Sequence, residues 1–172
     1  MKQSTDHILT THTGSLPRPS TLTDALERRY RGEAGDSDEL ARAIRGGVCD
    51  VVRRQVGAGV QVVNDGEASK IGYSTYVKER LDGFDGESTP AAPPPDAADF
   101  PAYWAERHGD PGAVRPACTG PLAYQALDAV RTDIANLRAA LDGVDVADAF
   151  MTAASPGVVA LALPGQPALP QP

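Results

Sequence analysis

A chain of 172 residues, 41% hydrophobic and 23% charged, can bury one domain-sized core, and this composition excludes a wholly disordered protein. The net charge of −7 argues against nucleic acid as a partner, because an acidic surface repels phosphates. Two cysteines give no disulfide framework, residues 1–13 lack the apolar run of a signal peptide, and no segment approaches the roughly 20 apolar residues of a membrane helix. We therefore expect a cytoplasmic protein with neither a membrane nor a nucleic-acid partner.

The first third of the chain predicts alternating strands and helices. A short strand over residues 7–11 runs into a stretch with two prolines, and a weak helix is expected over about 21–31. The strongest helical pattern begins at Asp36–Ser37, either of which can cap it, and Glu39 then stands where a capping box needs it. Apolar residues follow at helical spacing until two glycines end the pattern.

A short β-branched run over residues 60–64 then predicts a strand, which ends at the acidic loop 65–67. A helix, a glycine stop, a short strand and a loop together favour a parallel sheet with functional groups at the carboxyl ends of its strands. Further elements are expected, in chain order, as a helix around 73–81, a Pro-rich linker over 85–99, a short helix over 100–108, a strand over 114–118 with a turn at 119–121, a helix over 122–141 and a strand over 149–152.

Three loops at these strand ends carry motifs that together resemble one family. They are Thr10-Thr11-His12-Thr13-Gly14-Ser15-Leu16-Pro17, Val63-Asn64-Asp65-Gly66-Glu67 and Cys118-Thr119-Gly120-Pro121. In this order and spacing they resemble the signatures of the cobalamin-independent methionine synthases, and in particular the short members that keep only the catalytic barrel. The resemblance spans Ile8 to about Leu163.

The resemblance implies an α/β fold that is part of a (β/α)8 barrel of the uroporphyrinogen-decarboxylase and methionine-synthase type. Such a barrel needs about 250 residues, so this chain is expected to supply about its first four β/α units. Residues 1–160 are interpreted as the N-terminal half of the barrel. Residues 161–172 are interpreted as a Pro-rich tail, either disordered or translated out of frame.

The family uses zinc to activate a thiol, usually homocysteine, which takes a methyl group from methyltetrahydrofolate in methionine biosynthesis. The resemblance implies that the Gly14–Ser15 turn holds the substrate carboxylate, that Glu67 pairs with its ammonium group, and that the turn beginning at Cys118 lines the pocket. The substrate-binding residues that follow are Thr13, Gly14, Ser15, Glu67, Cys118, Thr119 and Gly120. The expected partner is a small thiol.

The zinc ligands are a different matter, because the family carries them in the second half of its barrel. The sequence has no His-x-Cys pair, and its remaining candidates form no cluster by spacing: His7, His12, His108, Cys49 and Cys118. No residue is therefore assigned as catalytic or as a metal ligand, and this chain alone is expected to be inactive.

Plainer interpretations stay open beside these. Gly14 and Ser15 can be simple turn residues, Glu67 can be a solvated acid or a helix cap, and Cys118 can serve packing alone. Asp128 and Asp133 lie off the apolar stripe of their helix and are expected to be solvated. Alternative functions are a non-catalytic, degenerate fragment, a coenzyme M type thiol transferase and a decarboxylase. Open sheet edges further predict self-association.

Overall fold

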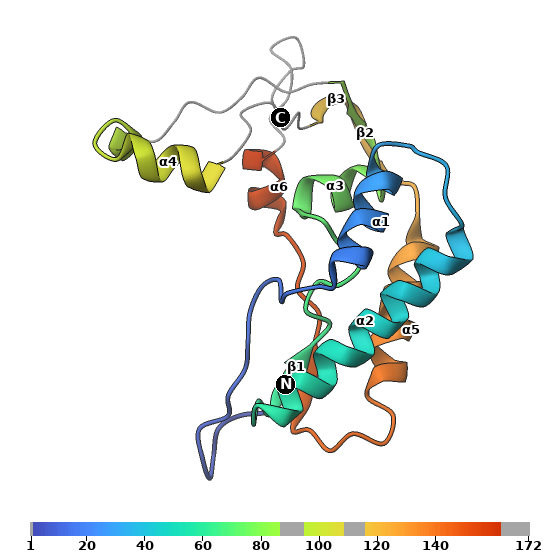
Figure 1. The fold of residues 1–172 in the computed structure, drawn as a ribbon, viewed down its shortest axis with the longest axis vertical. Helices are drawn as coiled ribbons and strands as arrows, with labels where there is room; N and C mark the ends of the chain where they lie inside the picture. The colour runs from blue at the N-terminus through green and yellow to red at the C-terminus, as the bar shows by residue number, and fades with distance from the viewer. Residues whose placement is uncertain (1, 87–94, 109–115, 163–172) are drawn as a thin grey trace.

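The computed structural model describes residues 2–86, 95–108 and 116–162, which form a mixed α/β structure (Figure 1). In chain order its elements are α1 (Ser20–Tyr30), α2 (Ser37–Gly57), β1 (Val62–Asn64), α3 (Tyr73–Lys78), β2 (Leu81–Asp85), the 3-10 turn η1 (Pro95–Ala97), α4 (Pro101–His108), β3 (Ala117–Tyr124), α5 (Leu127–Ala140), β4 (Asp148–Phe150) and α6 (Pro156–Ala162). No helix within these ranges is long and apolar enough to cross a membrane.

Local signals place α1 and α2 as expected. The Asp36 carboxylate accepts the backbone N–H groups of Asp38 at 2.8 Å and Glu39 at 3.1 Å, which confirms it as the N-cap of α2. Such a cap contributes about 1 kcal/mol to stability. The helix ends at Gly57, and Gly59 then adopts a φ of +81°, which costs a glycine little.

A parallel sheet forms the centre of the structure. β1 pairs with β4 in parallel, with Val63 opposite Ala149, and Thr11 forms a parallel bridge to Val62 on the other side of β1. The strand expected over residues 7–11 is thus reduced to a single bridge. Since all three segments run in one direction, the loops that follow them lie at the same edge of the sheet.

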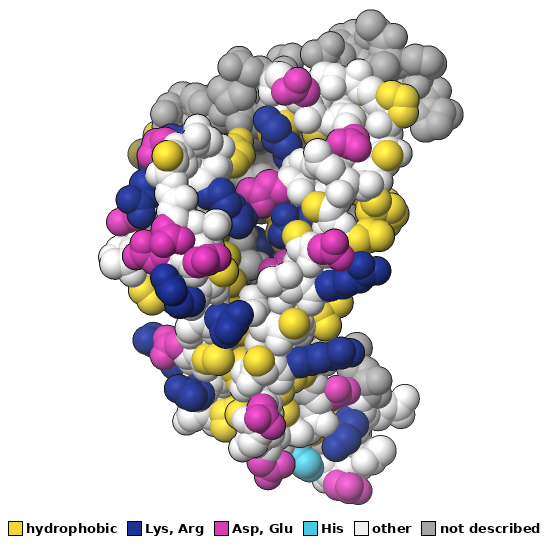
Figure 2. All heavy atoms as spheres, turned by 90° about the vertical axis from the view of Figure 1, so that its right-hand side faces the viewer, with side chains coloured by type: hydrophobic (Ala, Val, Ile, Leu, Met, Phe, Trp, Pro, Cys, Tyr) yellow, Lys and Arg dark blue, Asp and Glu magenta, His cyan; other side chains and the backbone are white. Residues whose placement is uncertain are grey.

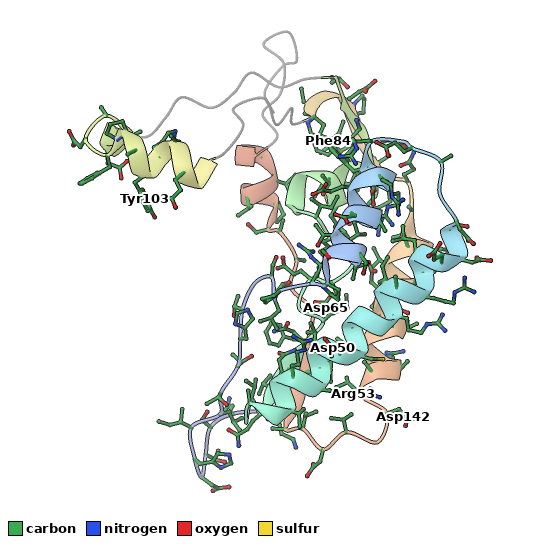
Figure 3. The ribbon with its side chains drawn as sticks, in the orientation of Figure 1. Asp50, Arg53, Asp65, Phe84, Tyr103 and Asp142 are labelled. Atoms are coloured by element: carbon green, nitrogen blue, oxygen red, sulfur yellow. The ribbon has the colours of Figure 1, made fainter. Side chains whose placement is uncertain are left out.

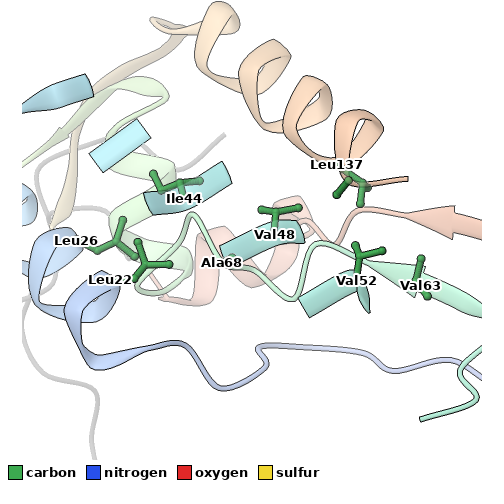
Figure 4. Close-up of a cluster of buried hydrophobic side chains, with 9 residues drawn as sticks. Leu22, Leu26, Ile44, Val48, Val52, Val63, Ala68 and Leu137 are labelled. Carbon is green, nitrogen blue, oxygen red and sulfur yellow. The ribbon is translucent and has the colours of Figure 1, made fainter. Parts of the chain in front are cut away.

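The main core packs between this sheet and the helices. α2 packs against α1, α5 and β1, and α2 lies beside α5 in Figure 1. The buried side chains that meet here are shown in Figure 4, and they are Leu22, Leu26, Ile44, Val48, Val52, Val63, Ala68, Leu137 and Ala140. Fully burying each of the larger ones contributes about 1.5–3 kcal/mol, so this cluster holds the helices onto the sheet.

The second sheet corrects the expectation of a third parallel strand. β2 pairs with β3 in antiparallel fashion, from Leu81 opposite Tyr124 to Asp85 opposite Ala117. The expected turn at 119–121 therefore lies within a strand, and α5 begins at Leu127 instead of residue 122. The cause is β2 itself, which sequence reasoning did not anticipate. It pairs with both ends of β3, and a register shift between Asp82 and Phe84 leaves residues 119–122 of β3 without a partner opposite them.

The other helices and strands differ less from their expected bounds. The helix expected around 73–81 is α3, which ends at Lys78, and the strand expected over 149–152 is β4, shifted by one residue at its start. Helix α6 was not anticipated. Residues 87–94 of the expected linker, 114–115 of the expected strand and 163–172 of the expected tail lie outside the described residues. The α/β class is confirmed, whereas the described strands do not form the continuous parallel sheet of a half barrel.

Candidate functional site

Three loops meet where the parallel segments end. Ser15 follows the bridge at Thr11, Glu67 follows β1, and Thr152 follows β4. The Ser15 hydroxyl donates to Glu67 Oε2 at 2.6 Å, and the Thr152 hydroxyl donates to Glu67 Oε1 at 2.8 Å. Glu67 is 4% exposed. A nearly buried carboxylate thus has both oxygens held by hydroxyl groups from segments 52 and 85 residues away.

The loop after β1 is built to direct Glu67 toward this meeting point. The Asn64 side chain accepts the N–H of Gly66 at 2.8 Å, and the Asp65 carboxylate accepts the N–H of Glu67 at 3.2 Å. Gly66 and Glu67 both have left-handed backbones, with φ of +58° and +56°. A residue other than glycine in that region costs about 1–3 kcal/mol, and such strain concentrates at functional sites.

Two cations reinforce the same loop. Lys70 is buried, and its ammonium donates to the Thr152 carbonyl at 2.9 Å and lies 3.9 Å from Asp65 Oδ2. The Arg18 guanidinium donates to the backbone carbonyls of Glu67 and Lys70. Burial raises the pKa of the Asp65 carboxyl above its ordinary value of 3.8, and the nearby Lys70 charge offsets part of that rise. We call Ser15, Arg18, Glu67, Lys70 and Thr152 the strand-end cluster.

The turn at residues 13–15 contributes backbone groups to the same edge. Gly14 has a φ of +98°, which the turn requires and which favours glycine. Within the described part of the chain, no backbone hydrogen bond engages the N–H groups of Thr13, Gly14 or Ser15.

The other residues expected at the site lie elsewhere. Cys118 packs with Val77 and Phe84 in a second apolar cluster, and the Thr119 hydroxyl donates to the Gly83 carbonyl at 3.4 Å. Gly120 lies on the same strand. Figure 3 shows Phe84 of that sheet well separated from Asp65 in the loop after β1. The structure brings Ser15 and Glu67 together and does not bring the Cys118–Gly120 segment to them, so its place in the pocket stays a prediction.

Sequence reasoning missed three members of the strand-end cluster. Thr152 ends a predicted strand, so the positional argument that selected Glu67 also applies to it. Arg18 and Lys70 carried no such signal, because their roles depend on carbonyls that only the folded chain brings within reach.

The expectation that Asp133 is solvated is wrong, because its side chain is buried. The Tyr76 hydroxyl donates to its carboxylate at 2.9 Å, and Arg80 Nη2 lies 3.5 Å away. Burial, together with the negative charge of Asp133, raises the pKa of Tyr76 to about 12. The helical stripe alone could not show this, since the partners come from α3 and the residues after it.

The described residues do not form a zinc site. His7 is exposed, Cys49 packs on the main core and Cys118 packs on the second cluster. His12 has a buried Nε2 atom without a hydrogen-bond partner among the described residues. No group of three or more His, Cys, Asp or Glu side chains in the described ranges is placed to hold a metal ion. We therefore derive no chemical step through zinc from these residues.

Known proteins resemble the chain in sequence and in fold. Over 75 residues it is 35% identical to a methionine synthase of Saccharolobus islandicus and 36% identical to that of Sulfolobus acidocaldarius. A structure of a B12-independent methionine synthase from Shewanella sp. W3-18-1 in complex with selenomethionine covers 92% of this chain with a TM-score of 0.60 and 18% identity. The chain is similar in sequence to part of the methionine synthases and in fold to a B12-independent one. No protein-family model matches it.

The extent of this relationship with the methionine synthases is limited. The sequence match covers 44% of this chain and 22% of either relative, and the structural match covers 41% of the Shewanella chain. The chain thus spans about a fifth of the length of the curated methionine synthases that it matches. The family resemblance found in the motifs is confirmed, and the likeness to the Shewanella structure concerns the fold.

Proposed function

We propose that the strand-end cluster binds the amino-acid portion of a homocysteine-like thiol, as the acceptor part of a methionine-synthase-type methyltransferase site. The observation that carries this proposal is the bonding of Glu67 by Ser15 and Thr152 at the shared edge of the parallel segments. Ligands of parallel α/β sheets bind at this edge. The Shewanella relative was solved with selenomethionine, which carries the same two amino-acid groups.

The chemistry of the cluster suits a zwitterion. A carboxylate accepts hydrogen bonds at about four lone-pair positions, so Glu67 can receive an ammonium donor while the two hydroxyls hold its orientation. The N–H groups of Thr13, Gly14 and Ser15 can donate to the ligand's carboxylate. Because the hydroxyls fix the Glu67 carboxylate before any ligand arrives, little side-chain entropy is lost on binding.

The full reaction proposed for the family site is methyl transfer from methyltetrahydrofolate to homocysteine, with zinc activating the thiol. The described residues supply the amino-acid-binding part of that site. They supply no zinc-binding group.

A binding experiment on the whole chain tests the acceptor site. We expect L-homocysteine and L-methionine to bind by isothermal titration calorimetry, and Glu67→Gln to weaken both at least about tenfold, since a charged hydrogen bond contributes about 1.5–3 kcal/mol. Glu106→Gln, an exposed acid on α4, removes the same charge away from the site and should leave both affinities unchanged. Equal affinities for Glu67→Gln and wild type would refute the site.

A second candidate, a non-catalytic amino-acid-binding chain, is favoured by the lack of a metal-binding group among the described residues. The two candidates differ in thiol selectivity. If zinc takes part, homocysteine binds more tightly than methionine and a chelator abolishes the difference. If zinc does not, the two amino acids bind alike with or without chelator. A coenzyme M type acceptor lacks the ammonium group, so 2-mercaptoethanesulfonate binding would be insensitive to Glu67→Gln.

A further inference from the structure

A polar hollow of about 1000 Å³ lies between α1, α2 and α5, apart from the strand-end cluster. Its walls are the outer turns of α1, the loop 31–36, the first turns of α2 and the first half of α5, and Ser69 and Arg80 also line it. Figure 2 shows the face where these helices meet, hollowed and with basic and acidic side chains inside the recess. None of the five residues of the strand-end cluster lines this hollow.

Two buried polar atoms here lack partners. Ser69 is 5% exposed, and neither its Oγ atom nor Arg80 Nε has a hydrogen-bond partner within the described residues. Leaving a buried donor unsatisfied costs about 1–3 kcal/mol, and folded proteins contain few such atoms. Arg80 Nε can only donate, so the missing partner is an acceptor.

The rest of the Arg80 side chain is held in place. Its two terminal nitrogens lie 3.3 Å from Glu79 and 3.5 Å from Asp133, and its guanidinium stands 4.5 Å from the centre of the Tyr76 ring. These contacts fix the guanidinium plane and occupy both Nη atoms. The remaining Nε–H group is thus a buried, fixed donor on a residue that lines the hollow.

Positive charge without a carboxylate partner lines the same walls. Arg28 on α1 and Arg45 on α2 form no ion pair within the described ranges, whereas Arg29 and Arg31 are paired with acids. Acidic residues line the hollow too, and those without a basic partner there include Asp24 and Glu39. The acids that line the recess are at least as numerous as its basic residues, so they disfavour a polyanion. A single anionic group can still be held by the fixed donors and the two unpaired guanidinium groups.

We propose that this hollow binds an oxyanion, the carboxylate or phosphate group of a small molecule, with Arg80 Nε and Ser69 Oγ as its donors and with Arg28 and Arg45 supplying charge. The site is independent of the amino-acid site at Glu67. A guanidinium whose plane is already fixed loses little freedom when it takes up such a group.

The test is an NMR titration of the full chain with acetate and, separately, inorganic phosphate at constant ionic strength. We expect saturable shifts of the Ser69 and Arg80 amides in the millimolar range. The ion that saturates at the lower concentration identifies the group. Ser69→Ala, which removes a buried hydroxyl without a partner and leaves folding intact, should weaken binding several-fold.

A charge-matched pair of variants separates a site from general attraction. Arg28→Gln with Arg45→Gln should weaken binding about tenfold, which corresponds to about 1.4 kcal/mol. Arg42→Gln with Arg138→Gln changes the net charge equally at exposed positions outside the hollow and should leave binding within twofold. Shifts that do not saturate, or equal losses in the two double variants, would overturn the proposal.

Discussion

Replacing Gly66 by alanine should destabilise the chain more than any other simple change in the loop after β1. The left-handed backbone of Gly66, with φ of +58°, costs an alanine about 1–2 kcal/mol. An added Cβ would also lie 2.6 Å from Val51 Cγ1 and 3.2 Å from Leu16 Cβ, inside a packed region. Overpacking of that kind costs about 1–3 kcal/mol, so the total loss is about 2–5 kcal/mol.

Two other glycines separate these causes in a urea-unfolding assay. Gly59→Ala has φ of +81° but nothing within 4 Å of its new Cβ, so it should cost only the backbone part, about 1–2 kcal/mol. Gly46→Ala lies exposed within α2 with open space around it and should stabilise by about 1 kcal/mol. If Gly66→Ala and Gly59→Ala lose the same stability, the close packing of Gly66 against Val51 and Leu16 is refuted.

The pKa of Tyr76 is raised from 10.0 to about 12, so between these pH values the Tyr76 hydroxyl ionises only in the unfolded chain. The free energy of unfolding should therefore fall as pH rises through this window. Tyr76→Phe should remove this part of the pH dependence in alkaline unfolding curves. Asp133→Ala should cost about 3–5 kcal/mol by leaving Arg80 buried without that partner, whereas exposed Asp128→Ala on the same helix should change the unfolding free energy by less than about 0.5 kcal/mol. Since β4 is paired on one side only among the described strands, light scattering should show a mass that rises with concentration, and a constant monomer mass would contradict association through sheet edges.

The helices were predictable where the signal lies within the helix itself. The cap at Asp36 and the apolar spacing through Val52 are local, and α2 forms where they indicate. Helix α5 shows the limit of such reasoning. Its apolar stripe includes Leu127 and Ile134, yet these are 51% and 37% exposed, while Asp133, off the stripe, is buried. The buried side of α5 is set by its neighbours, and a sequence stripe carries no information about them.

Strand pairing was the least predictable feature. The run around Val62 predicts a strand, and the parallel bridge and β4 then bring Ser15 and Thr152 to Glu67. The resemblance supplied Ser15 and Glu67 but not Thr152, whose role appears only once β4 is known to lie beside β1. The expected turn beginning at Cys118 lies within β3 for the same kind of reason, since the partner strand β2 was not anticipated.

The strand-end cluster is a poor arrangement for stability alone, which is the strongest physical argument that it serves function. It places Glu67 and Lys70 in buried positions, and replacing buried charges by apolar side chains is often neutral or stabilising. It adds two consecutive left-handed residues, one of which is not a glycine. The hydrophobic core takes Ala68 from this loop but none of the five residues of the strand-end cluster. Costs that gather at the carboxyl edge of parallel strands, where ligands bind, support the proposal that the cluster binds one.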